Sequence, residues 1–362
     1  MEKIMLYIVA LFFIVGIIDY ILGNRLKLGY GIENGIKSMG SLALSMVGIL
    51  SITPIISDFL SKYILSVFSK GLLDPSIISS SLIAVDMGGF KIAEAIGGST
   101  DIIYFSGILI SSILGCTISF TIPLALGIID EKNMDIFCKG ILCGIITIPI
   151  GLFIGGILLK ISLIEIVVSL LPIIIISILL IIGLYRIPSK MVIYFKRLAK
   201  GIFIIGLIGL GLQGLNSIVG ISLVNNLLPL EEAITIVGKI AIFLAGSNVM
   251  LEVIKRFFSK QIITLERKLH INSDSVAALI GSLASAVIIF TDFDKLDNRG
   301  KVLCSAFSVS GAYVFGGQLA YVVAEAKNVV LIYILVKLIS GFLAILLALK
   351  VIKNDKLIRN DI

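Results

Sequence analysis

Long apolar blocks fill most of the chain, and they limit its fold more than any other feature of the sequence. Each block has about 18 to 25 residues, the length that crosses a bilayer as a helix. The blocks can be drawn at 4–22, 38–57, 72–97, 102–129, 138–159, 162–184, 198–219, 234–254, 273–290, 302–324 and 328–350. Alternation of apolar and polar residues, which marks a membrane β-barrel, is absent from the sequence. The pattern therefore predicts an all-α, polytopic helical membrane protein.

Composition and charge agree with this class. Hydrophobic residues make up 58% of the chain and charged residues 15%, whereas a soluble domain is about half apolar and about a quarter charged. The net charge of +7 comes largely from Lys and Arg in short segments between blocks, so we expect a lipid bilayer around the chain and no nucleic-acid partner. Because the first block has no A-x-A cleavage site, we expect it to be retained as a span.

No sequence pattern points to a cofactor, a metal ion or catalysis. The four cysteines include no CxxC pair, and the single histidine, His270, has no neighbouring ligand, so we expect packing roles for the cysteines and no metal site. They are Cys116, Cys138, Cys143 and Cys304. The sequence has no GxxxxGK[ST] phosphate loop and no nucleophile–base pair. The GxGxxG run at 209–214 follows no strand, so we expect its glycines to serve helix packing.

Basic residues orient the blocks, because cytoplasmic loops are enriched in Lys and Arg. Such residues concentrate in the segments 186–200 and 255–268 and in the tail 350–359, whereas the segment 221–233 has two glutamates and no Lys or Arg. We therefore expect the three basic segments in the cytoplasm and the acidic segment outside. Traced from these loops, the N-terminus is expected outside and the C-terminus in the cytoplasm.

Two blocks do not fit as simple crossings in this tracing. The block 72–97 must enter and leave on the outside, and the block 273–290 must do so on the cytoplasmic side. Both have polar or small residues at their middle, which suits a re-entrant or broken hairpin whose backbone lines a cavity. Two ordinary crossings would also satisfy the block lengths.

The order span, hairpin, span, span occurs twice along the chain. We expect one transmembrane transporter domain, residues 1–362, with about nine full spans and two hairpins. Its first repeat is 38–159, its second repeat is 234–350 in the opposite orientation, and spans at 162–220 link them. In secondary transporters with such inverted repeats, the binding site lies where the broken elements meet.

Asp86 is the strongest candidate for a binding residue. It follows an apolar run at the middle of the first hairpin and precedes Gly88 and Gly89. These two glycines are candidate binding residues as well, because they free the backbone beside the carboxylate. Ionisable residues at membrane depth are costly and functional by default, so Asp86 is expected to bind an ammonium group or an ion. The alternative is that it caps the following half-helix. Asp19, near the end of the first block, is a weaker candidate and is more typical of an interface residue.

The second half of the chain offers uncharged polar candidates. Asn248 lies inside the block 234–254, Ser282 and Ser285 mark the middle of the second hairpin, and Gln318 follows two glycines. Each could contribute a hydrogen bond to a ligand in the site.

Five short motifs, in order along the chain, resemble the EutH family, the ethanolamine permeases of bacterial ethanolamine-utilisation operons. The resemblance covers nearly the whole chain. The motifs are 39–48, 86–90, 122–129, 146–151 and 297–302. The resemblance implies a multi-pass protein of the bacterial cytoplasmic (inner) membrane that brings ethanolamine into the cell.

The chain departs from the family pattern in its second half. It reads Gly-Gly-Gln-Leu at 316–319 where the family is expected to read Gly-Asp-His-Leu. It also has Ser285-Ala286 and Ile288 where the family is expected to have an Asn-Asn pair followed by Pro. Asp19 and Asp86 are in place, so the departures concern the substrate more than the fold.

These observations predict a transporter that imports ethanolamine, a small ammonium alcohol. Asp86 is expected to bind the ammonium group, and Ser285, Asn248 or Gln318 the hydroxyl group. Two alternatives stay open: a gradient-driven transporter of another small amine, a nucleoside or an amino acid, and a membrane sensor or scaffold without transport. Uniport, proton coupling and sodium coupling are all compatible with the sequence, as is a homo-oligomer.

Overall fold

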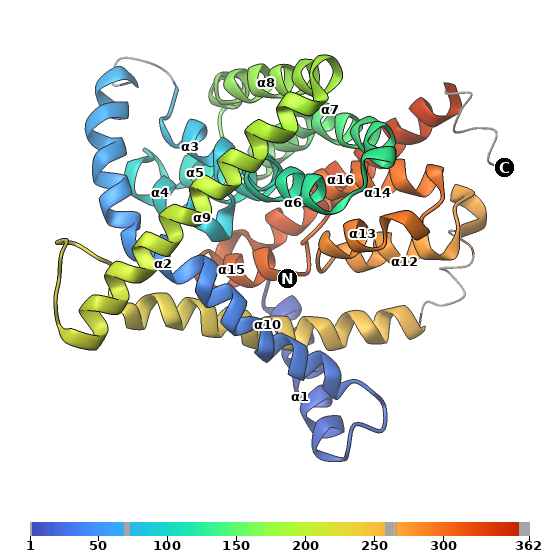
Figure 1. The fold of residues 1–362 in the computed structure, drawn as a ribbon, viewed down its shortest axis with the longest axis horizontal. Coiled ribbons are helices and arrows are strands. Elements are labelled where there is room, and N and C mark those ends of the chain that lie inside the picture. The colour runs from blue at the N-terminus through green and yellow to red at the C-terminus, as the bar shows by residue number, and fades with distance from the viewer. Residues whose placement is uncertain (1, 69–72, 258–263, 265, 355–362) are drawn as a thin grey trace.

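A computed structural model of the chain describes residues 2–68, 73–257, 264 and 266–354. Every regular element in these ranges is helical, and they contain no strand. Parts of the predicted cytoplasmic segments, 258–263, 265 and 355–359, lie outside the described residues. The long helices are α1 (Glu2–Ile21), α2 (Gly29–Phe68), α7 (Met134–Leu158), α8 (Leu163–Arg186), α9 (Pro188–Val219), α10 (Leu230–Phe257) and α16 (Val330–Asn354) (Figure 1).

Seven helical stretches in the described residues are long and apolar enough to cross a membrane. They are Gly29–Ile56, Thr100–Ile128, Glu131–Leu158, Leu163–Arg186, Lys200–Val219, Leu230–Ile254 and Lys327–Lys353. The protein is therefore a multi-pass helical membrane protein, but two of the nine expected full spans fall outside this set. The first block forms α1, whose apolar part, Leu6–Ile21, is shorter than the seven.

The other exception is the block 302–324, and its prediction as one continuous span is wrong. The structure breaks it at residues 311–316 into α14 (Asn298–Ser310) and α15 (Gly317–Glu325). Gly311, Gly316 and Gly317 weaken a helix at this point, because glycine has the greatest conformational freedom to lose. The break also allows residues 311–316 to pack against another interrupted helix.

Both predicted hairpins are broken helices, as expected. The first contains α3 (Ser76–Leu82), the 3₁₀ turn η1 (Val85–Met87) and α4 (Gly89–Ile96). Residue 72, the first residue of the predicted hairpin, lies outside the described residues. The second contains α12 (Ser273–Ser282) and α13 (Val287–Thr291). In each hairpin the two half-helices contact one another. The side of the membrane on which each hairpin begins and ends stays a prediction, as does the relation between the two repeats.

One span forms the centre of the molecule. It consists of α5 (Thr100–Ile103), the π-helical segments η2 (Tyr104–Gly115) and η3 (Thr117–Thr121), and α6 (Ile122–Ile128). In its most apolar stretch 89% of the residues are buried, compared with 17% in the span Lys200–Val219 of α9. The central span therefore packs on protein around its whole circumference, whereas α9 lies at the periphery and crosses the front of the view in Figure 1.

Close helix packing explains part of the GxGxxG run. Gly209 of α9 contacts the carbonyl group of Gly48 in α2, and a Cβ atom at Gly209 would collide with it. The expected packing role is confirmed at this position, whereas Gly211 and Gly214 face open space.

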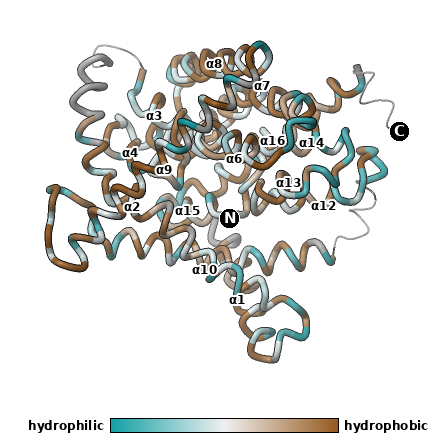
Figure 2. Tube along the Cα trace, viewed as in Figure 1, coloured by the Kyte–Doolittle hydropathy of each residue, from teal (hydrophilic) through white to brown (hydrophobic). Residues whose placement is uncertain are grey.

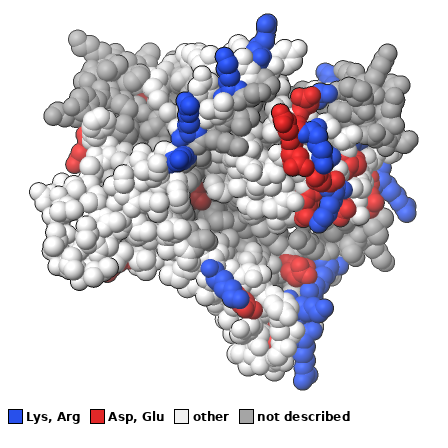
Figure 3. All heavy atoms as spheres, viewed as in Figure 1, with Lys and Arg blue, Asp and Glu red and all other residues white. Residues whose placement is uncertain are grey.

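Figure 2 shows hydrophobic residues along most of the long helices, and hydrophilic segments near the loop after α1 and around α12 and α14. Figure 3 shows the same separation: charged side chains gather over the α12–α14 side of this face, while much of the opposite side carries none.

Candidate functional site

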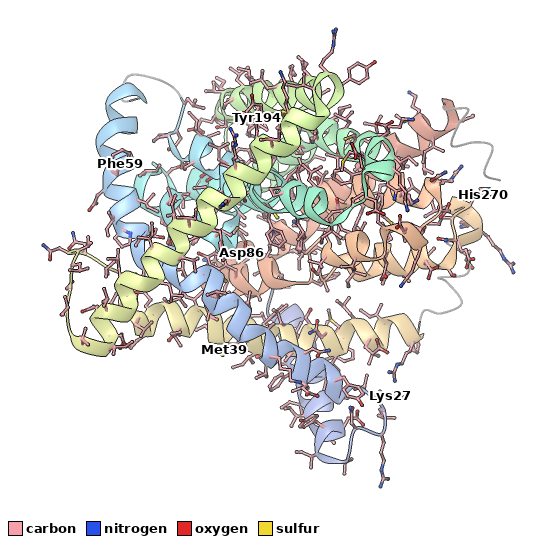
Figure 4. The ribbon with its side chains drawn as sticks, in the orientation of Figure 1. Lys27, Met39, Phe59, Asp86, Tyr194 and His270 are labelled. Atoms are coloured by element: carbon pink, nitrogen blue, oxygen red, sulfur yellow. The ribbon has the colours of Figure 1, made fainter. Side chains whose placement is uncertain are left out.

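Three helix interruptions meet at a cavity of about 500 Å³. Asp86 and Met87 line it from the first break, and Ala284 and Ser285 line it from the second. The third break contributes Tyr313, with Gly317 and Gln318 directly after it. Side chains of α2, α10 and the central span complete the wall with Ser38, Leu42, Met46, Leu244, Asn248, Cys116 and Phe120. Figure 4 shows Asp86 near the middle of the molecule, whereas Lys27 and His270 lie at its edges.

Two glycines shape the first break. Ile83 has an extended backbone that ends α3, and Gly88 has a φ of 95°, in the left-handed region that glycine adopts without a steric penalty. At Gly89 a Cβ atom would lie only 2.7 Å from the Ile83 carbonyl oxygen. Gly88 and Gly89, the other binding candidates from this break, therefore set the path of the chain and lie outside the cavity lining.

Serines of the central span satisfy the backbone groups that this break exposes. The Ser111 hydroxyl donates a hydrogen bond to the Ile83 carbonyl oxygen at 2.8 Å. The Ala84 N–H donates to the Ser119 hydroxyl oxygen at 3.2 Å. Irregular backbone at membrane depth is tolerated only where protein or a cavity satisfies it. The break is therefore a supported structure that places Asp86 at the cavity.

The Asp86 carboxylate has no hydrogen-bond or salt-bridge partner among the other described residues, and it is partly exposed to the cavity. The alternative role as a helix cap is wrong, because the N-cap of α4 is Gly88 and no side chain caps that helix. Lys337, a charged side chain of α16, contacts the cavity residue Gln318 but does not line the cavity itself. The cavity therefore has a carboxylate that no other described residue engages by a hydrogen bond or salt bridge.

The second and third breaks hold each other through backbone hydrogen bonds. The Tyr313 N–H donates to the Ser282 carbonyl oxygen at 2.9 Å, and the Phe315 N–H donates to the Leu283 carbonyl oxygen at 2.8 Å. The Ser282 side chain is buried and donates to its own helix, so Ser282 supports the site without lining the cavity. Ser285, the other candidate from this break, does line it.

Gln318 presents a defined end of its amide group to the cavity. Its side-chain oxygen accepts hydrogen bonds from the Lys337 ammonium at 2.8 Å and from the Tyr333 hydroxyl at 3.4 Å. These donors fix the orientation of the amide, since only its oxygen can accept. The Gln318 NH₂ group, which also interacts with the Cys116 thiol, is then the hydrogen-bond donor that Gln318 can offer to a ligand.

Asp19, in contrast, lies outside the cavity lining. Its carboxylate accepts backbone N–H groups of Leu26 and Leu28, each at 2.8 Å, and of Gly29 at 3.2 Å. These bonds fix the loop between α1 and α2, so a structural role accounts for Asp19. The structure brings Asp86, Asn248, Ser285 and Gln318 together, and a binding role for any of them stays a prediction.

Comparisons with known proteins match this architecture to one family. The family model described as "Ethanolamine utilisation protein, EutH" matches residues 1–351. The chain belongs to the EutH family. The Listeria monocytogenes protein named "Probable ethanolamine permease EutH" is 36% identical over 344 residues, which cover 95% of this chain and 92% of that protein.

Two further relatives carry the same name. The Escherichia coli protein is 32% identical and the Salmonella typhimurium protein 31% identical, and each alignment covers 98% of this chain and 96% of the relative. No solved structure matches the chain. The resemblance seen in the sequence motifs is confirmed at the level of the family.

Sequence reasoning missed several residues of this EutH-family site. Tyr313 and Phe120 line the cavity with their ring centroids 5.9 Å apart, and the buried Tyr313 hydroxyl has no partner among the described residues. Cys116, expected to serve packing alone, also lines the cavity. Lys337 contacts the cavity residue Gln318 without lining the cavity itself. Only Lys337 carried a signal in the sequence: an ionisable residue inside an apolar block.

A salt bridge ties the first broken helix to the third. The Lys91 ammonium in α4 lies 2.6 Å from the Glu325 carboxylate in α15 and 3.1 Å from that of Glu94. The helix α15 carries the cavity residues Gly317 and Gln318, and α4 follows directly after the turn η1 that carries Asp86. This ion pair therefore fixes the Asp86 break relative to Gln318.

Proposed function

We propose that this chain imports ethanolamine across the bacterial cytoplasmic membrane. Three relatives of 31 to 36% identity are named probable ethanolamine permeases. The observation that carries the proposal is Asp86, a carboxylate partly exposed to a cavity inside a membrane protein and without a partner among the other described residues. Within the described residues, no cationic side chain lines the cavity beside this carboxylate, so its oxygens can pair directly with a ligand of opposite charge.

The cavity suits a small ammonium alcohol. By analogy with lysine, whose pKa is about 10.4, the amine of ethanolamine is protonated near neutral pH. Asp86 would bind this ammonium group, and the rings of Phe120 and Tyr313 add faces that attract cations. Gln318 would donate a hydrogen bond to the hydroxyl oxygen at the other end of the substrate. Ser285 and Asn248 line the same space and offer further hydroxyl and amide groups.

The membrane potential is the driving force in this proposal. A cation that moves inward gains about 2.3 kcal/mol per 100 mV, which corresponds to roughly 50-fold accumulation, since 1.4 kcal/mol is a factor of ten. The proposal includes the predicted orientation in the membrane, with the N-terminus outside and the C-terminus in the cytoplasm. Figure 1 supports it, because the α9–α10 connection, predicted to be external, lies far from the C-terminal ends of α10 and α16, predicted to be cytoplasmic.

Uptake of labelled ethanolamine into proteoliposomes tests the proposal through Asp86→Asn. We expect this variant to insert in the membrane at normal levels and to lose uptake, because the amide cannot pair with an ammonium charge. Asp101→Asn is the matched control: Asp101 is exposed in the first turn of α5 and lies outside the cavity lining, so uptake should persist. Wild-type uptake by Asp86→Asn would exclude Asp86 from the site.

A competition series identifies the substrate class. Unlabelled ethanolamine should compete fully with labelled ethanolamine, whereas nucleosides and amino acids should compete little. Stronger competition by one of those compounds would replace ethanolamine with another substrate on the same fold. Absence of uptake for all of them would favour a membrane sensor or scaffold.

A further inference from the structure

A buried lysine contacts the cavity wall through Gln318. Lys337, in α16, is only 1% exposed. Its ammonium donates hydrogen bonds to the Ser112 carbonyl oxygen at 2.9 Å and to the Gln318 side-chain oxygen at 2.8 Å. It also lies 5.6 Å from the centroid of the Tyr333 ring. All three partners are neutral, and no carboxylate of the described residues forms a salt bridge with it. Such a charge is expensive to bury, which points to a function.

Gln318 connects Lys337 to the break that carries Asp86. The turn η1, which carries Asp86, packs against α15, which carries Gln318. Lys337 does not line the cavity, but its ammonium contacts Gln318, which lines the cavity together with Asp86. A ligand can therefore contact Asp86 without contacting Lys337. With Asp86 ionised and Lys337 protonated, the charges of these two side chains sum to zero when the cavity holds no ligand.

We propose that Lys337 is the resident counter-cation of Asp86 and keeps the empty site electrically neutral. The inference rests on the proposed function. A transporter that imports a cation without exchange has to return its empty site across the membrane. With Asp86 alone, the empty site would return through a medium of low dielectric constant with a net charge of −1. With Asp86 and Lys337 together, the net charge of the empty site during this step is zero. The substrate then gives the loaded site a charge of +1.

Two consequences follow from this charge balance. No proton or sodium ion has to bind for the empty site to return, because Lys337 supplies the compensating charge. The membrane potential acts on the loaded step, where the net charge is positive, and so drives the substrate inward. The inference therefore selects uniport among the three coupling schemes that the sequence left open.

The test compares net uptake with exchange in proteoliposomes that contain the wild type, Lys337→Met or Lys337→Arg. Net uptake into vesicles without internal ethanolamine requires return of the empty site, whereas exchange of external labelled for internal unlabelled ethanolamine does not. We expect the ratio of net uptake to exchange to fall at least about tenfold in Lys337→Met, because an uncompensated buried charge costs several kcal/mol. Lys337→Arg keeps the charge and should keep the ratio near that of the wild type.

Lys239→Met is the matched control, since Lys239 is exposed on α10 and lies outside this cavity. An unchanged ratio in Lys337→Met would overturn the inference. Should that variant fail to fold, the wild type still decides: potassium-diffusion potentials should drive net uptake at equal pH and without sodium. A strict requirement for a sodium or proton gradient would overturn the inference. Absence of both net uptake and exchange in the wild type would instead refute the proposed function.

Discussion

Two adjacent glycines offer a test of how the second and third breaks fit together. Gly316→Ala and Gly317→Ala add the same methyl group at neighbouring positions. A Cβ atom at Gly316 would collide with the Ala284 carbonyl oxygen, whereas one at Gly317 has no atom within 4 Å. The Ala284 carbonyl belongs to the backbone of the second break, so it cannot move aside as a flexible side chain can. Overpacking of this kind costs about 1–3 kcal/mol.

The size of the expected effect follows from the length of the chain. With an unfolding entropy of about 2.1 cal/mol/K per residue, this cost lowers the Tm of a 362-residue chain by roughly 1–4 °C. Gly317→Ala should keep or slightly raise the Tm, because Gly317 begins α15 and Ala is the better helix former. Thermal unfolding in detergent measures both variants.

The same glycine pair predicts a difference in uptake. Gly316→Ala should also reduce ethanolamine uptake, since a displaced third break moves Tyr313 and Gln318 in the cavity. Gly317→Ala adds one methyl group to a cavity of about 500 Å³ and should transport nearly as the wild type does. Equal melting temperatures and equal uptake for the two variants would refute the proposed contact between the breaks.

Two further predictions concern ionisable groups away from the cavity. Glu325→Gln should destabilise the protein by about 1–3 kcal/mol, because it removes a charged hydrogen bond from Lys91. The Glu94 side chain is 42% exposed, so Glu94→Gln should cost less than about 1 kcal/mol. Equal melting temperatures for the two variants would contradict this difference. The pKa of Asp294 is lowered by hydrogen bonds from the Asn133 amide and from a neighbouring lysine. Its contribution to stability is therefore present above the unfolded pKa of 3.8 and lost at lower pH, so Asp294→Asn should flatten the fall of Tm between about pH 5 and 3. An unchanged dependence of Tm on pH in Asp294→Asn would exclude a contribution of Asp294 to the acid-induced loss of stability.

The first break was predictable because its residues are exceptional inside an apolar block. A carboxylate at membrane depth is costly and rare, and the two glycines that follow it weaken the helix at the same point. The third break was missed for the opposite reason, since glycines such as Gly311 and Gly316 also occur in continuous transmembrane helices, where they allow close packing. Contacts with the second break, such as that of Gly316 with Ala284, distinguish the two cases, and they join segments about 30 residues apart.

Charge alone did not separate Asp19 from Asp86. Both are acidic residues in apolar blocks, but the partners of Asp19 are backbone groups of the following loop, which sequence spacing does not reveal. Lys337 fits the general rule that ionisable residues inside spans are functional. A lysine in an apolar helix also resembles a side chain that extends to the interface. Its inward direction is visible only in the contacts with Ser112 and Gln318.

The three breaks differ in what they leave unsatisfied, and this difference defines the chemistry of the site. Serine hydroxyls satisfy backbone groups at the first break, and the second and third breaks bond to each other. The Gln318 oxygen is occupied by Lys337 and Tyr333. Among the described charged groups, only the Asp86 carboxylate lines the cavity, and no hydrogen bond from another described residue occupies it. A ligand that enters this space therefore meets one free negative charge, aromatic faces and a fixed amide donor, which together favour a small cation with an acceptor oxygen at its other end.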